Sequence, residues 1–112
     1  MNAKTIVGRE FLLPFAKPGR ENIGVELEFP LVNMDRGPVD VAVARGLLEE
    51  CMQKHGFWAE EFDQEGNAAF LLNPDGDCLS FDNSYNNFEF SMEKGKDLNE
   101  LARRFYALYE KV

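Results

Sequence analysis

The sequence predicts an α+β domain: a mostly antiparallel sheet of about five strands with two amphipathic helices packed on one face. Residues 22–32 alternate apolar and polar side chains with a period of two, the pattern of a half-buried strand. Three short apolar runs between residues 57 and 81 are separated by compact turns, which favours antiparallel neighbours. Residues 39–55 and 97–112 repeat apolar side chains at steps of three and four, as amphipathic helices do.

The chain divides into an N-terminal arm, residues 1–21, and a single domain, residues 22–112. With 112 residues, 45% of them hydrophobic, it is long enough for one modest core. The arm contains the apolar run Phe-Leu-Leu-Pro-Phe at residues 11–15, followed by Lys-Pro-Gly-Arg. Its prolines and glycine disfavour a long helix. We therefore expect an irregular or short helical arm that docks on the core or on a partner.

The first strand and the first helix follow the arm. In the strand, Glu26 and Glu28 share one side while the apolar residues fall on the other. A turn-rich loop at residues 33–38 leads into the helix at residues 39–55, which Gly56 is expected to end. His55, the single histidine, lies near the helix end, where we interpret it as a favourable partner of the helix dipole rather than a ligand.

The remaining elements are short strands and a closing helix. Strands are expected at residues 57–62, 68–72, 78–81 and 87–92, joined by turn-forming sequences at 63–67, 73–77 and 82–87. The turn at 73–77 lacks the glutamate and the spacing of a calcium loop, so we interpret it as a plain hairpin. Asp97 with Glu100 three residues later has the pattern of a helix capping box.

Composition excludes several function classes. The formal charge of −8 argues against nucleic-acid binding and against attraction to anionic membranes. Cys51 and Cys78 have neither zinc-ligand spacing nor a disulfide framework, so we expect reduced, partly buried thiols. No apolar run approaches the roughly 18 residues of a membrane span, and the first ten residues lack a signal-peptide core. We therefore expect a cytoplasmic protein.

Four carboxylates form the candidate site. Glu26 and Glu28 lie on one strand face, Glu89 lies on the matching face of the strand at 87–92, and Asp82 precedes Glu89 by seven residues. If these two strands are neighbours, three or four carboxylates converge. Hard cations such as Mg²⁺ and Mn²⁺ prefer oxygen ligands of this kind. A solvated acidic sheet face is the alternative, and the residue pattern alone leaves both open.

Two segments resemble the glutamate–cysteine ligases (γ-glutamylcysteine synthetases), which share a fold with glutamine synthetase. Gly-Val-Glu-Leu-Glu at residues 24–28 is similar to the family's opening Gly-x-Glu-x-Glu strand. Residues 82–91 resemble the segment in which an acidic residue and a serine precede a strand bearing a ligand glutamate. Residues 97–111 resemble the helix that follows it. The similar parts together span residues 22–112.

The resemblance implies an ATP-dependent carboxylate–amine ligase that forms γ-glutamylcysteine in glutathione-type biosynthesis. Its partners would be ATP, glutamate and cysteine, and its cofactor Mg²⁺ or Mn²⁺ with ATP. By position, the metal-binding residues would be Glu26, Glu28, Asp82 and Glu89, with Ser84 as a nearby substrate contact. The cations would screen the phosphates while the γ-carboxylate of glutamate attacks the γ-phosphate.

The chain departs from the family in length. Such ligases are several times longer, and their adenine pocket and phosphate-clamping basic residues lie downstream of the matched part. We therefore expect an N-terminal fragment and not a complete enzyme. It would be one domain of a protein with a downstream domain, a shortened gene product, or one partner of a split enzyme. The alternative is a non-catalytic α+β interaction or oligomerisation module, whose exposed sheet face binds another chain or a second copy with help from Phe11, Pro14 and Phe15. A small stand-alone ligase or kinase-like enzyme is a third interpretation, but the six arginines share no phosphate-clamping motif.

Overall fold

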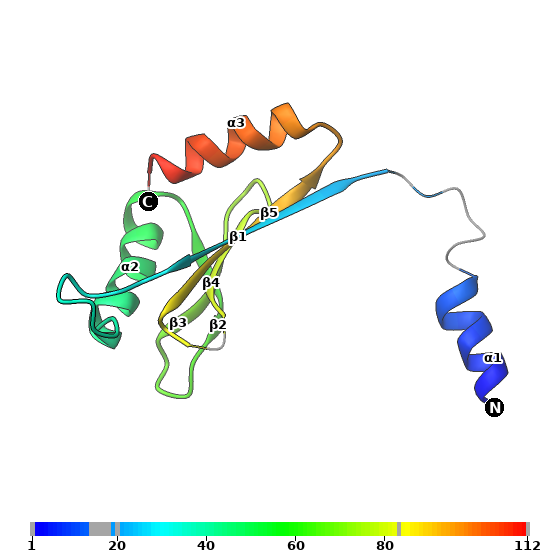
Figure 1. The fold of residues 1–112 in the computed structure, drawn as a ribbon, viewed down its shortest axis with the longest axis horizontal. Helices are drawn as coiled ribbons and strands as arrows, with labels where there is room; N and C mark the ends of the chain where they lie inside the picture. The colour runs from blue at the N-terminus through cyan, green and yellow to red at the C-terminus, as the bar shows by residue number, and fades with distance from the viewer. Residues whose placement is uncertain (1, 14–18, 20, 83, 112) are drawn as a thin grey trace.

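A five-stranded antiparallel sheet organises the molecule (Figure 1). The computed structural model describes residues 2–13, 19, 21–82 and 84–111. The spatial strand order is β1-β5-β4-β3-β2. The strands are β1 (Ile23–Pro30), β2 (Trp58–Phe62), β3 (Ala68–Leu72), β4 (Cys78–Phe81) and β5 (Asn87–Gly95), and the two long helices are α2 (Val41–Lys54) and α3 (Leu98–Tyr109). The predicted α+β class is confirmed.

The core lies between the sheet and the two long helices. One row of opposed residues crosses four strands: Leu27 of β1 faces Phe90, Phe90 faces Leu79, and Leu79 faces Leu71. Leu48 of α2 and Leu108 of α3 join this row in one hydrophobic cluster. Because successive strand residues point to opposite faces, the rows on either side of it belong to the open face of the sheet. Both long helices therefore cover the same face, as predicted.

The open face carries two rows of its own. Glu28 faces Glu89, which faces Ser80 of β4, which faces Phe70 of β3. The second row runs from Glu26 through Ser91 and Cys78 to Leu72. The half of this face near β1 is thus acidic, and the half near β3 is apolar.

Helix capping sets the bounds of both long helices. Helix α2 begins two residues later than predicted, because the Asp40 carboxylate accepts a hydrogen bond from the Ala42 N–H at 2.8 Å and so forms its N-cap. It ends at Lys54, followed by Gly56 with a φ of +75°. Helix α3 begins after Asp97, whose carboxylate accepts from the Asn99 N–H at 2.6 Å.

Strand β5 is longer than the apolar alternation predicts. The prediction ended it at Met92, where the alternation stops, but the strand continues to Gly95. The extra residues run beside the start of β1, where Ile23 pairs with Gly95 across an irregular step in register. Backbone pairing with a neighbouring strand, which leaves no side-chain pattern, accounts for the difference.

A buried ion pair fixes α3 to the sheet. Asp77, in the β3–β4 turn, is 4% exposed. Its Oδ1 accepts from the backbone N–H of Glu93 at 3.0 Å and from the guanidinium of Arg104 in α3. Arg104 also donates through Nη1 to the Glu93 carbonyl at 3.0 Å. The turn, β5 and α3 therefore meet at one charge pair.

The arm contains a short helical segment, as expected. It comprises α1 (Ala3–Val7) and the π-helical turn η1 (Gly8–Leu12), and none of these residues is buried. Figure 1 shows α1 clear of the sheet and of both long helices. Pro14 and Phe15, which we expected to assist docking, lie outside the described residues. Within the described part of the chain, no helix is long and apolar enough to cross a membrane.

Two glycines predict opposite effects of alanine. Gly46 lies in the middle of α2 on its exposed side, and an added Cβ would meet no atom within 4 Å. We expect Gly46→Ala to raise the free energy of unfolding by about 0.5–1 kcal/mol, because alanine restricts the unfolded chain and favours helix. Gly76 has a φ of +85°, and a Cβ there would lie 3.1 Å from the Glu93 side chain. Gly76→Ala should lower the same quantity by more than about 1 kcal/mol. Urea unfolding of the two single variants measures both changes in the free energy of unfolding. Changes of the same sign in the two variants would contradict these expectations.

Candidate functional site

The predicted carboxylate strands are neighbours. Strand β1 pairs with β5 in antiparallel register, and Glu28 lies directly opposite Glu89. This was the condition on which convergence of the carboxylates depended. Two like charges opposite each other on a sheet repel and give no stability by themselves.

Three of the four predicted metal ligands come together. Glu28, Asp82 and Glu89 each offer one carboxylate oxygen, and these oxygens lie within 4.8 Å of one another. Asp82 reaches the group from the bend after β4, which is closed by a 3.0 Å hydrogen bond from its N–H to the Asn87 carbonyl. A cation with ligands at about 2.0–2.6 Å can bridge oxygens spaced in this way.

Glu26 lies apart from this group. It shares the open face with Glu28 but lies opposite Ser91, one row further along the sheet. Successive residues on one strand face are about 7 Å apart, so its carboxylate belongs to the next row of the face. The structure thus divides the predicted set into a cluster of three and one outlying glutamate.

Two polar side chains orient the cluster. Asn87 donates through Nδ2 to Oε2 of Glu28 at 2.7 Å, and the Ser91 hydroxyl donates to Oε1 of Glu89 at 2.6 Å. Each bond engages one oxygen of its carboxylate. These two roles were not predicted, although both residues lie two positions from Glu89 and therefore share its face of the sheet. Hydrogen bonds that orient ligand carboxylates are a regular feature of metal sites.

The electrostatic environment of the cluster is acidic. Ion pairs among the described residues join Arg9 with Glu10, Arg45 with Asp63 and Glu65, Lys54 with Glu50, Lys94 with Glu93, and Arg104 with Asp77. Within that described part, no ion pair engages Glu28 or Glu89. The repulsion between the two glutamates is thus not offset by a lysine or arginine there.

Ser84 lies in the bend after β4, where its N–H donates to the backbone carbonyl of Asp82 at 2.5 Å. It lines a pocket of about 270 Å³ with Ala69, Phe81 and Tyr85. The ring of Phe81 contacts that of Phe88, a core residue, at a centroid distance of 5.2 Å. The pocket therefore adjoins the helix-covered side of the sheet, and its lining includes no member of the carboxylate cluster.

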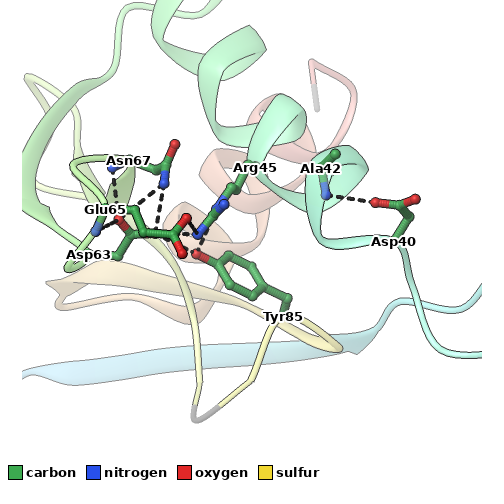
Figure 2. Close-up of polar contacts among 7 residues, drawn as sticks. All are labelled: Asp40, Ala42, Arg45, Asp63, Glu65, Asn67 and Tyr85. Carbon is green, nitrogen blue, oxygen red and sulfur yellow. Dashed lines mark hydrogen bonds and ion pairs between the residues drawn. The ribbon is translucent and has the colours of Figure 1, made fainter.

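A second polar cluster ties α2 to the sheet (Figure 2). Arg45 of α2 pairs through Nη2 with Oδ2 of Asp63 at 2.8 Å and with Glu65 at 2.9 Å. The Tyr85 hydroxyl donates to the same Asp63 oxygen at 3.0 Å, and Asn67 donates to Asp63 from its backbone and side chain. The cluster joins the helix, the β2–β3 turn and the bend before β5. The Arg45 guanidinium pairs with two carboxylates and donates through Nε to the Tyr85 hydroxyl at 3.2 Å, so we assign this cluster a structural role.

The Asp63 carboxylate predicts an acid-dependent loss of stability. The backbone N–H of Asn67, with further donors on Asn67 and Tyr85, holds the pKa of Asp63 well below its usual range. A carboxylate whose pKa is lowered by folding stabilises the protein above its unfolded pKa of about 3.9, and this contribution is lost as pH falls through the folded value. We expect Asp63→Asn to destabilise the protein at pH 7 and to flatten its stability profile below about pH 4. Thermal unfolding from pH 7 to pH 2.5 measures this, and parallel profiles for the two proteins would contradict it.

Neither cysteine is an activated nucleophile. Both are free thiols, and Cys51 is buried in the core. Burial raises the pKa of the Cys51 thiol to about 11, and burial also raises the pKa of Cys78. A thiol with a raised pKa is a poor nucleophile and a poor metal ligand near neutral pH. The chemistry available on the open face is therefore that of its carboxylates.

We compared the chain with known protein families, curated proteins and solved structures. No protein-family model, curated protein or solved structure matches the chain. The resemblance of residues 24–28 and 82–91 to glutamate–cysteine ligases stays a prediction from the sequence.

Proposed function

We propose that the open face of the sheet binds a divalent cation, Mg²⁺ or Mn²⁺, together with the phosphates of ATP. In this proposal the chain is the cation-binding N-terminal part of a glutamate–cysteine ligase-like enzyme. The observation that supports it is the convergence of Glu28, Asp82 and Glu89 from two adjacent strands and the bend between β4 and β5. The family assignment rests on the sequence resemblance alone.

The chemistry of the cluster suits a hard cation. Three carboxylates supply the anionic oxygens that Mg²⁺ and Mn²⁺ prefer, and a bound cation would offset their mutual repulsion. Glu28 is exposed, while Asp82 and Glu89 are half-buried, so the cluster lies at the surface. Coordination positions toward solvent remain available for water or phosphate oxygens. Mg²⁺ sites that share phosphates commonly use only a few carboxylates in this way.

During ligation, side chains of this chain would bind and orient the cation. Glu28, Asp82 and Glu89 would fix the cation, while Asn87 and Ser91 orient two of these carboxylates. The cation, when bound, screens the ATP phosphates against the attacking carboxylate of glutamate. Selection of the amino acids and clamping of the phosphates by basic residues are assigned to other parts of the enzyme.

Thermal unfolding in the presence of Mg²⁺ alone, ATP alone, and both together tests this function. We expect Mg²⁺ with ATP to raise the melting temperature more than either ligand alone, because a ligand that binds only the native state stabilises it. At about 100 times Kd the gain is about 2.7 kcal/mol. Asp82→Asn should abolish the difference, whereas Asp75→Asn, in a turn outside the cluster, should retain it. Equal melting temperatures with and without Mg²⁺ and ATP in the unaltered protein would refute the proposal.

The apolar half of the open face favours a second candidate, an interaction module. Trp58 on the edge strand β2 is 41% exposed, and Phe70 and Leu72 beside it are half-buried. An aromatic and aliphatic patch of this kind is typical of protein contact surfaces. This candidate predicts self-association or partner binding that is unaffected by metal and nucleotide, and Trp58→Ser should weaken it.

A further inference from the structure

Two rows of residues cross all five strands on the open face of the sheet. The first row consists of Glu28, Glu89, Ser80, Phe70 and Glu61, and the second of Glu26, Ser91, Cys78, Leu72 and Trp58. The rows contain four glutamates and no lysine or arginine. Every side chain in them is half-buried or exposed, because both long helices cover the other face. Within the described part of the chain, this face therefore stays open across its full width.

Three of the four glutamates lie on the two edge strands. Glu26 and Glu28 belong to β1, and Glu61 belongs to β2 on the opposite edge. Four strand spacings of about 4.8 Å separate these edges, about 19 Å in all. Among the residues that the structure describes, no ion pair engages a glutamate of either row. Both edges of the face thus present negative charge to a basic partner.

The part of the face between these edges is largely apolar. Phe70 and Leu72 of β3 are half-buried, and they adjoin Trp58, which is 41% exposed. The Trp58 Nε1 donates to the Glu60 carboxylate at 2.5 Å, which orients the indole ring. The residues of β4 in the two rows are small. Tryptophan is enriched among the residues that contribute most to protein interfaces. The face therefore combines an apolar centre with acidic edges.

We propose that the open face binds a basic amphipathic helix of another protein. A strand adds to the edge of a sheet, whereas a helix covers a face. A helix with its side chains is about 10–12 Å wide, so its apolar stripe fits over the middle strands while lysines or arginines on its flanks extend to Glu26 and Glu61. A second copy of this chain would instead place glutamates against glutamates, and each copy carries a net charge of −8.

This inference rests on the interaction-module candidate and specifies the chemistry of its partner. The cation proposal depends on Glu28, Asp82 and Glu89. Glu26 and Glu61 lie outside that cluster, so substituting them tests the helix proposal separately from the cation proposal.

Isothermal titration of the full chain with a synthetic peptide tests the proposal. The probe is a peptide of about 14 residues, made of leucine and lysine, with its leucines at helical steps of three and four. We expect it to bind and to shift the fluorescence of Trp58, the single tryptophan, to shorter wavelength. A scrambled peptide of the same composition has no apolar stripe and should bind much more weakly.

Three variants locate the bound peptide. Glu26→Gln/Glu61→Gln should weaken its binding about fivefold, because two exposed charge pairs are lost. Trp58→Ser should weaken it by at least about 30-fold, as truncation of a central interface tryptophan does. Glu49→Gln/Glu110→Gln removes the same charge from α2 and the C-cap of α3, and should leave the affinity nearly unchanged.

Several results would overturn the proposal. One is a leucine–lysine peptide that does not bind, or that binds no better than its scrambled form. Equal affinities of the two double-glutamate variants would also overturn it, because the peptide would then bind outside the open face. A dimer that Trp58→Ser dissociates would show a second copy on this face, with the same consequence. If Trp58→Ser does not fold, the two double variants, which alter only exposed carboxylates, still decide.

Discussion

Arg104→Met should lower the free energy of unfolding by about 3 kcal/mol, because it leaves the buried Asp77 carboxylate without its cationic partner. The backbone N–H of Glu93 still donates to Asp77, which limits the loss. For a domain whose total stability is of the order of 5–15 kcal/mol, this is a large effect. Urea unfolding at pH 7 provides the measurement.

Two control variants distinguish loss of the Arg104–Asp77 ion pair from a general destabilisation of α3. Arg103→Met alters the exposed neighbour on the same helix and should change stability by less than about 0.5 kcal/mol. Adding Asp77→Asn to Arg104→Met should recover part of the loss, since the uncompensated buried charge is then removed. If Arg104→Met and Arg103→Met are equally stable, the ion pair does not fix α3 to the sheet.

Glu28→Gln/Glu89→Gln should weaken Mn²⁺ binding by at least about 100-fold. Glutamine keeps the size of each side chain but removes two anionic charges from the cluster, and changes even to groups outside the ligand shell of metal sites cost about 10–100-fold. Isothermal titration with Mn²⁺ measures the affinity. Glu49→Gln/Glu110→Gln removes two exposed carboxylates, one on α2 and one at the C-cap of α3, and is matched in net charge, so it should leave the affinity nearly unchanged.

Substitution of Glu26 tests whether three or four carboxylates form the cation site. Because its carboxylate belongs to the neighbouring row of the open face, we expect Glu26→Gln to weaken Mn²⁺ binding by less than about tenfold. A loss as large as that of the Glu28 and Glu89 double variant would show that the four-ligand set predicted from the sequence acts as a unit. Equal affinities in all of these variants would remove the cation site from this face.

Local sequence patterns were sufficient for most of the fold. Strands β3 and β4 begin and end at the predicted residues because turns with Gly66 and Gly76 bound them, and both glycines have positive φ. The alternation of apolar and polar residues in β1 was likewise a local signal, and it correctly placed Glu28 on the open face. Boundaries set by pairing or by capping, such as the end of β5 and the start of α2, were displaced by two or three residues.

Long-range contacts had no signal in the sequence. Arg45 with Asp63 and Arg104 with Asp77 join residues 18 and 27 positions apart, and they depend on how each helix lies on the sheet. The same limit applied to the site. Residue spacing placed four carboxylates near one another, but only the register of β1 against β5 and the bend at Asp82 divide them into three and one.

The most direct measurement is the anomalous difference map of crystals grown with Mn²⁺. The cation proposal predicts a peak on the open face of the sheet, bonded at about 2.0–2.3 Å to oxygens of Glu28, Asp82 and Glu89. The peak should be missing from crystals of the Glu28→Gln/Glu89→Gln variant grown in the same way. An unaltered protein whose three carboxylates hold no Mn²⁺, or whose Mn²⁺ lies elsewhere, would contradict the proposal.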